Sequence, residues 1–194
     1  IFLKLYGVNK ININTNYQKS EVFIFYQEST RYWVKATVGL PYYAKNGTIA
    51  APAHGRYLYF DNLDAAHITC SLINSSIFYS YFITLGDCFH LSDSIVANFP
   101  VASEVMNDAK LINLNIQLSL FLESISGRKT IVTKDGDNIT YDEFNVSASK
   151  PIIDEIDCVL ARCYGFTEEE LDFIVNYDIK YRMGRDPETE NGEK

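Results

Sequence analysis

The chain has 194 residues, 47% of them hydrophobic and 22% charged, which is the composition of an ordinary globular protein able to bury a substantial core. No run of 18 apolar residues occurs, so the sequence indicates no transmembrane helix and we expect no membrane partner. The net charge of −8 argues at first sight against a protein that binds nucleic acid.

The charge is spread unevenly along the chain. The first 60 residues carry seven lysines and arginines against two glutamates. Residues 61–100 carry four aspartates and no lysine or arginine, and residues 101–194 carry ten cations against 19 acidic groups. A surface that binds phosphates would therefore have to lie in the first 60 residues. A random spread of surface lysines is the simpler alternative.

Cysteine usage and the N-terminal segment bear on the compartment. The four cysteines form no CxxC pair, which is typical of reduced thiols in a cytosolic protein. The segment IFLKLYGVNK lacks the long apolar region and cleavage site of a signal peptide. We therefore expect a cytoplasmic protein.

The first third of the chain has the alternation and the residue types of strands. Residues 21–28 and 32–39 predict two strands around a short turn, and residues 55–61 predict a third. Residues 40–55 contain two prolines and two glycines, which predicts a long exposed loop.

Helical spacing follows, with Asp61 or Asn62 as the first N-cap and Gly127 as the last stop. The predicted helices are residues 62–72, 77–85, 91–99 and 103–126. Periodicity alone allows either a strand or a buried helix at 77–85, and the helical context favours the helix.

The remaining residues predict a hairpin and two helices. Residues 129–146 read as a hairpin around Asp-Gly-Asp-Asn. Ser149 is the expected cap of the next helix, which Gly165 ends. Thr167 and Glu170 have the spacing of a capping box for the last helix.

These elements predict an α+β protein with a small mixed or antiparallel sheet, a helical cluster, a β-hairpin and two C-terminal helices. We expect residues 1–147 to form one domain, residues 148–184 to form a helical pair packed on it, and residues 185–194 to be a disordered tail.

Catalytic and metal-binding motifs are lacking in the sequence. It has no GxSxG, HExxH, P-loop or GxGxxG pattern, so we assign no catalytic residue. Cys88 and His90 are a close pair, but a structural zinc site needs four ligands, and we assign no metal site.

Three blocks, in order, carry a family resemblance. They are YWVKATVGLPYY (32–43), residues 57–100 with INSSIF and GDCFHL, and residues 147–184. Together they resemble the C-terminal target-recognition domain, called the TaqI-like specificity domain, of bacterial adenine-specific DNA methyltransferases of type II restriction–modification systems. Phe89 stands where the family often has arginine, and Leu40-Pro41-Tyr42 lacks the polar residue of the family's catalytic motif.

The resemblance implies a non-catalytic fragment that recognises DNA for such an enzyme. The chain begins at Ile1 and has no room for a catalytic domain, so its expected partners are double-stranded DNA and the missing N-terminal catalytic domain. No cofactor is expected in the fragment itself, whereas the parent would use S-adenosylmethionine and could be fused to an endonuclease.

The DNA-binding residues implied by this reading fall into three groups. Phosphate or guanine contacts would come from Lys35, Lys45 and Arg56; Tyr42 and Tyr43 would pack on sugars or bases; Asn74, Ser75, Ser76 and His90 would be uncharged hydrogen-bonding groups. For residues 74–76 an N-cap role is the alternative. The alternative function is a protein-interaction or structural module that uses the acidic C-terminal helices.

Overall fold

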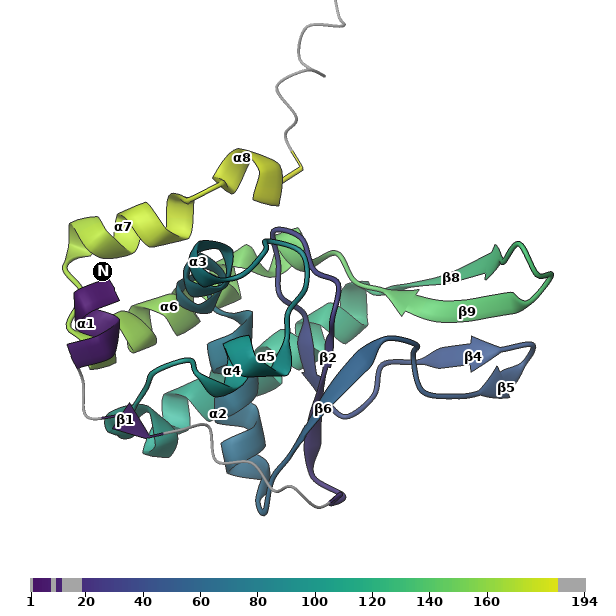
Figure 1. The fold of residues 1–194 in the computed structure, drawn as a ribbon, viewed down its shortest axis with the longest axis horizontal. Coiled ribbons are helices and arrows are strands. Elements are labelled where there is room, and N and C mark those ends of the chain that lie inside the picture. The colour runs from purple at the N-terminus through teal and green to yellow at the C-terminus, as the bar shows by residue number, and fades with distance from the viewer. Residues whose placement is uncertain (1, 8–9, 12–18, 185–194) are drawn as a thin grey trace, which may run out of the picture.

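A computed structural model describes residues 2–7, 10–11 and 19–184 of the chain. In this part the fold is α+β, as the sequence predicts. Helices form a body, and antiparallel strands lie beside the body and project from it (Figure 1). The disorder predicted for residues 185–194 lies outside the described residues.

A three-stranded antiparallel sheet lies against the helices in the order β3-β2-β6. Its strands are β2 (Phe23–Gln27), β3 (Ala36–Val38) and β6 (Gly55–Tyr59), which confirms the three predicted strands, with the second one shorter than expected. Because side chains alternate along a strand, Ile24 and Tyr26 are buried in the core, while Phe23 and Phe25 point to the opposite, outer face.

Two successive helices form the centre of the body. Asn62 caps α2 (Leu63–Asn74) by accepting the Ala65 N–H, and Ser75 caps α3 (Ser76–Leu85) by accepting the Phe78 N–H. The helix expected at 77–85 is therefore confirmed. A short helix, α4 (Asp93–Ala97), follows and is capped by Ser92.

The long helix expected at 103–126 is divided in two. A 3₁₀ turn, η1 (Ser103–Asn107), precedes α5 (Ala109–Ile125). The Asp108 carboxylate accepts the N–H groups of Lys110 and Leu111, so it starts a new helix within the apolar periodicity that suggested a continuous one. The small pair β1 (Lys10–Ile11) and β7 (Val101–Ala102) lies just before this turn, and α1 (Phe2–Gly7) begins the described chain.

The prediction of a loop over residues 40–55 is wrong. This segment forms a hairpin of β4 (Tyr43–Lys45) and β5 (Thr48–Ile49) around Asn46 and Gly47, which both have positive φ. The hairpin joins the predicted one, β8 (Gly127–Val132) and β9 (Asn138–Glu143), in a sheet of order β5-β4-β9-β8. We call this projecting four-stranded sheet the β-arm (Figure 1).

The C-terminal segment continues with η2 (Val146–Ser149), α6 (Lys150–Tyr164), α7 (Glu168–Asn176) and α8 (Ile179–Arg182), the last of which was not predicted. Gly165 ends α6 in the left-handed conformation, and the capping box of Thr167 and Glu170 is present. Ser149 occupies the predicted N-cap position of α6, but its hydroxyl makes no capping hydrogen bond and donates to the Val146 carbonyl instead.

The core is shared by elements from the whole described chain. Ile153, Ile156 and Leu160 of α6 belong to the same buried cluster as Ile68 and Leu72 of α2. Among the described residues no single helix is long and apolar enough to cross a membrane, and only α2 and α3 taken together, with a bend of 62° between them, meet that length and composition.

Candidate nucleic-acid interface

The β-arm brings together residues that are nearly 100 positions apart. Tyr42 immediately precedes β4, and the guanidinium carbon of Arg128 on β8 lies 3.6 Å from the centroid of its ring. Arg128 Nη2 also lies 3.0 Å from Oδ1 of Asp142, and the Tyr42 N–H donates to the same carboxylate. Tyr43 pairs with Tyr141 on β9. One of the predicted DNA-binding residues, Tyr42, is therefore joined to a cation that the sequence did not single out.

The tip of the β-arm is held by polar contacts between its two hairpins. The Lys45 ammonium lies 2.5 Å from Asp137, and the Asn46 side chain both donates to Asp137 and accepts the Asn138 N–H. The hydrogen bond that Lys45 donates to Asp137 raises the pKa of Lys45. Lys129 on β8 likewise pairs with Glu143 at 2.8 Å. The arm therefore presents Lys45, Arg128 and Lys129 as exposed cations, each beside an acidic partner.

At the foot of the β-arm lies a groove, which we call the arm groove, of about 370 Å³. It separates the arm from the outer face of the three-stranded sheet, and Lys35 lines it. Burial lowers the pKa of Lys35, with Glu143 as the nearest compensating charge. Lys35 is thus a half-buried cation in a cavity, whereas we expected it on an open surface.

Arg56 is already engaged by acidic groups of the body. Its guanidinium lies 2.8 Å from Glu28 and 3.1 Å from Asp93. The hydrogen bond that Arg56 donates to Glu28 raises the pKa of Arg56 and lowers that of Glu28. This network lies on β6 and its neighbours, away from the tip of the arm.

The prediction that Asn74, Ser75 and Ser76 contact DNA is wrong, because all three are buried. The Asn74 amide binds the backbone of β3, Ser75 caps α3, and the Ser76 N–H donates to Asp157. Buried side chains with these partners cannot reach a duplex. The capping alternative is confirmed for Ser75.

His90 lies in an exposed loop that Asp87 organises. The Asp87 carboxylate accepts the backbone N–H groups of Phe89 and His90 and lies 2.6 Å from Nδ1 of His90. Hydrogen bonds from His90 and Phe89 lower the pKa of Asp87 to about 2. The Arg31 guanidinium lies 5.6 Å from the Phe89 ring centroid, so a guanidinium is present at the loop where the resembled family often has an arginine.

A cavity of about 580 Å³ beside this loop is lined by residues of all three sequence blocks. Tyr32 comes from the first block, Cys88 from the second and Asp178 from the third. All three have positive φ. The segments that carry the family resemblance therefore meet in space, although they are widely separated in the chain.

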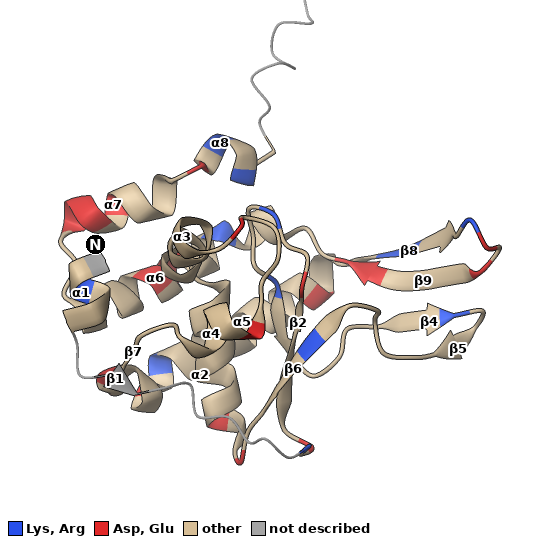
Figure 2. Ribbon diagram, in the orientation of Figure 1, with Lys and Arg blue, Asp and Glu red and all other residues tan. Residues whose placement is uncertain are grey.

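The cations of the first 60 residues do not form one face. Lys4 pairs with Glu170 on α7, Lys45 is at the tip of the β-arm, and Arg56 is on the body. Figure 2 shows lysines and arginines on several separate elements, interspersed with acidic residues. The expectation of a single N-terminal phosphate-binding face is wrong, because β4 and β9 pair across the chain and the later segment supplies Arg128 and Lys129.

No family model, curated protein or solved structure matches this chain. The function is therefore inferred from the residues and their arrangement.

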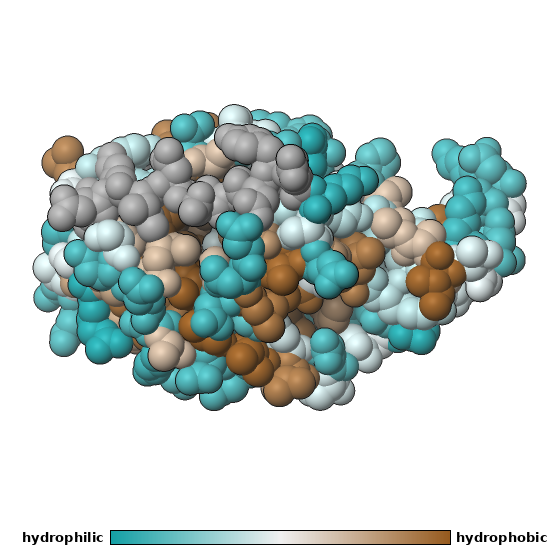
Figure 3. Space-filling view, turned by 90° about the horizontal axis from the view of Figure 1, so that it is seen from below, coloured by the Kyte–Doolittle hydropathy of each residue, from teal (hydrophilic) through white to brown (hydrophobic). Residues whose placement is uncertain are grey.

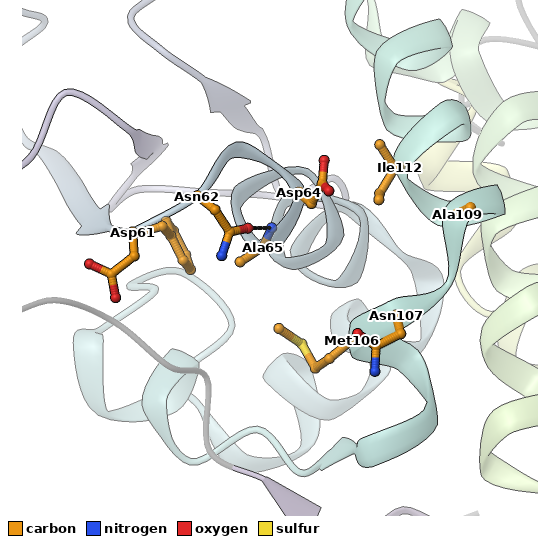
Figure 4. Close-up of a pocket in the computed structure, with 9 residues that line it drawn as sticks. Asp61, Asn62, Asp64, Ala65, Met106, Asn107, Ala109 and Ile112 are labelled. Atoms are coloured by element: carbon orange, nitrogen blue, oxygen red, sulfur yellow. Dashed lines mark hydrogen bonds between the residues drawn. The ribbon is translucent and has the colours of Figure 1, made fainter.

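A further cavity is unsuited to phosphate. It has a volume of about 530 Å³ and is lined by Asp61 and Asp64, with no lysine or arginine among its lining residues. Figure 4 shows the Asn62 side chain turned back onto the first turn of α2, where it accepts the Ala65 N–H. Within the described residues no three His, Cys, Asp or Glu side chains are grouped so that they could hold a metal ion.

Proposed function

We propose that this chain is the non-catalytic DNA target-recognition module of a bacterial adenine-specific DNA methyltransferase in a restriction–modification system, and that it contacts duplex DNA through the β-arm. The observation that carries the proposal is the projection of an antiparallel arm with Lys45, Arg128 and Lys129 exposed along it. The family named in this proposal rests on the resemblance of residues 32–43, 57–100 and 147–184.

The dimensions of the arm suit a DNA groove. Strands of six residues, such as β8 and β9, are roughly 20 Å long. The major groove of B-DNA, about 12 Å wide, admits a two-stranded β-ribbon. Every residue of β8 is exposed, and Figure 3 shows mainly hydrophilic side chains at the far end of the arm. Because β9 is paired on its other side with β4, the edge strand β8 and the turn between β8 and β9 are the parts of the arm that would enter the groove.

The acidic partners of the arm cations do not prevent phosphate binding. Exposed ion pairs contribute roughly 0–1 kcal/mol each, so exchanging a carboxylate for a phosphate costs little. A strongly negative body favours one orientation of the duplex, because Glu168, Glu169 and Glu170 begin α7, which lies away from the arm (Figure 1). The weak net charge of the arm predicts modest affinity in isolation.

The role fits the chemistry of the parent enzyme. A methyltransferase that acts on an adenine amine must turn the base out of the duplex, so a separate module has to hold the helix and read neighbouring bases. The catalytic domain of the same chain would bind S-adenosylmethionine, with or without a fused endonuclease. The module would act in the bacterial cytoplasm.

Fluorescence anisotropy with a panel of duplexes, in salt from 50 to 200 mM, tests the proposal. We expect salt-sensitive binding that the triple variant Lys45→Gln, Arg128→Gln, Lys129→Gln weakens, with the slope of log K against log salt reduced by up to about 0.9 for each lost phosphate contact. The matched control neutralises Lys110, Arg162 and Lys180 on the body. Equal losses in both triple variants, or no loss in the first, would exclude the β-arm as the DNA contact.

A second candidate function is protein interaction through the acidic C-terminal helices. Phe173 of α7 and Tyr181 of α8 remain 57% and 50% exposed, on the two helices that follow the acidic first turn of α7. This surface would bind the catalytic domain or another protein. The variant Phe173→Asp should then disturb that association and leave duplex binding unchanged. Absence of duplex binding at low salt would favour this second candidate.

A further inference from the structure

Three features of the arm groove distinguish it from the open face of the β-arm: its size, a cation that has no ion-pair partner among the described residues, and an aromatic lining. Its volume of about 370 Å³ is that of a small-ligand site. A DNA duplex is roughly 20 Å across, and its major groove alone is about 12 Å wide, so a duplex cannot enter the arm groove. The groove is lined by Phe25, Gln27, Lys35, Thr37, Pro41 and the segment 141–144.

Lys35 is the cation of the groove. Among the described residues its ammonium has no hydrogen bond and no ion pair, and Glu143 acts on it only through space, while burial withdraws it partly from water. The unfavourable burial of its charge is what lowers the pKa of Lys35. An anion placed in the groove would compensate that charge.

The two carboxylates that line the groove are already occupied. Asp142 binds Arg128 and accepts the Tyr42 N–H, and Glu143 binds Lys129. The lining carboxylates are therefore neutralised from the arm side, whereas Lys35 is not. The balance of charge in the groove favours an anionic ligand over a cationic one.

The lining of the groove is rich in aromatic rings. Phe25 comes from the three-stranded sheet, Tyr141 from β9 and Phe144 from the residue after it, and we call these three rings the aromatic wall. Stacking of a base on an aromatic side chain contributes about 1–3 kcal/mol and is tolerant of base identity. The Gln27 amide and the Thr37 hydroxyl add hydrogen-bonding groups beside this wall. A planar ring attached to an anion matches the lining better than an anion alone.

We propose that the arm groove binds a single unpaired nucleotide, with Lys35 on its phosphate and the aromatic wall against its base. The proposal deepens the nucleic-acid function proposed above and rests on it for the biological source of the ligand. The nucleotide is either free in solution or an unpaired position within a DNA strand, and these two sources share the same chemistry.

Isothermal titration calorimetry with purified protein tests binding of free ligands. The probes are AMP, GMP, CMP, adenosine, ribose 5-phosphate and inorganic phosphate. We expect the nucleoside monophosphates to bind more tightly than adenosine, which lacks the phosphate, and than ribose 5-phosphate, which lacks the base. Lys35→Met keeps the length of the side chain and removes its charge, and should weaken AMP binding about tenfold or more. Lys180→Met, at an exposed lysine of α8 that does not line the groove, is the matched control and should not change it.

The strand-borne source is tested by comparing a fully paired duplex with one that carries a single bulged nucleotide. A preference for the bulged duplex that disappears in Lys35→Met identifies the unpaired position as the ligand; no such preference, with AMP still bound, identifies the free nucleotide. Failure of every monophosphate to bind at 10 mM, as an order of magnitude for weak sites, together with no bulge preference, overturns the proposal. So does equal binding by wild type and Lys35→Met, with circular dichroism showing that both are folded.

The two proposals fail separately. Paired-duplex binding that depends on Lys45, Arg128 and Lys129, without nucleotide binding, refutes only the groove. Nucleotide binding that depends on Lys35, without duplex binding, refutes only the role of the β-arm.

Discussion

The side-chain amide of Asn74 forms hydrogen bonds with both the N–H and the carbonyl of Ala36, at 2.8 and 2.9 Å, across 38 positions of sequence. Asn74 therefore completes the free edge of β3 as a neighbouring strand residue would. The contact joins the end of α2 to the three-stranded sheet inside the core. It explains why a polar side chain is buried here and why it is not available to DNA.

Asn74→Ala should destabilise the protein by about 2–4 kcal/mol, because it leaves a buried N–H without a partner and opens a small cavity. Urea unfolding measures the change. Asn98→Ala is the control, since Asn98 is exposed and only caps α4 through the Ser94 carbonyl. A loss of similar size in both variants would contradict the assigned role of Asn74.

Asp157 makes stability depend on pH. Asp157 lies on α6 and is fully buried against the start of α3. Its Oδ1 accepts the Ser76 N–H at 2.9 Å, and burial raises its pKa to about 7. The folded protein thus binds a proton that the unfolded chain, with an ordinary pKa near 3.9, releases. The resulting stability is complete below about pH 4 and is lost as the pH rises through 7, by up to about 4 kcal/mol.

Asp157→Asn should remove this contribution. An asparagine Oδ1 still accepts the Ser76 N–H, and the replaced Oδ2 has no hydrogen-bond partner among the described residues. We expect the variant to gain stability over wild type as the pH rises from 5 to 8, measured by urea unfolding at each pH. Glu155→Gln is the control, because Glu155 is an exposed carboxylate on the same helix, 3.9 Å from Lys110. A difference between wild type and Asp157→Asn that is constant with pH would refute the raised pKa.

Arg182 stabilises the ionised form of Asp157 from α8. Its guanidinium carbon lies 3.9 Å from the Trp33 ring centroid, and Nη2 donates to the Ser76 hydroxyl at 3.0 Å. Arg182→Met should cost about 3 kcal/mol at pH 8, where Asp157 is charged, and less than about 1 kcal/mol at pH 5, where an apolar side chain of similar volume is tolerated.

Trp33 is the single tryptophan of the chain, and its Nε1 donates to the Arg182 carbonyl at 2.7 Å, so its fluorescence reports the unfolding of this site. Lys180→Met on the same helix provides the comparison and should show no such pH dependence. An equal loss of stability in Arg182→Met at both pH values would show that Arg182 does not act on the charge of Asp157.

Gly55 allows the close approach of β6 to the Phe25 ring. A Cβ at this position would lie 1.9 Å from Cε2 of Phe25, so Gly55→Ala forces the ring to move and should cost about 1–3 kcal/mol. Gly127→Ala on β8 meets no atom within 4 Å and should be neutral or slightly stabilising. Thermal unfolding compares the two variants, and equal melting temperatures would contradict the predicted clash.

Local chemistry made most helices predictable. Asn62, Gly165 and the pair of Thr167 and Glu170 satisfy or end the helix backbone within a few residues, so their roles can be read from sequence spacing. The same reasoning failed at Asp108, because a cap placed inside a continuous apolar stripe leaves the periodicity intact. At Ser149 the position of the cap was predicted correctly, but the hydroxyl donates to the Val146 carbonyl and makes no capping hydrogen bond.

The candidate site depended on contacts that no local pattern contains. Asn46 and Gly47 signal a hairpin in the sequence, but the partner strand of β4 lies about 100 residues further on. That pairing placed Arg128 over Tyr42 and created the groove around Lys35. Likewise, only the tertiary structure shows that Asn74 is buried in the core, because the residue type alone does not tell whether an asparagine lies inside with partners or on the surface.

The sequence by itself determined the α+β class, the caps and the order of the elements, because these follow from interactions between residues close in the chain. Only the tertiary structure decided which charges stand alone and which are paired, because an ion pair such as Lys4 with Glu170 joins residues 166 positions apart. Electrostatic character at a site is a property of distance in space, and composition along the chain does not contain it.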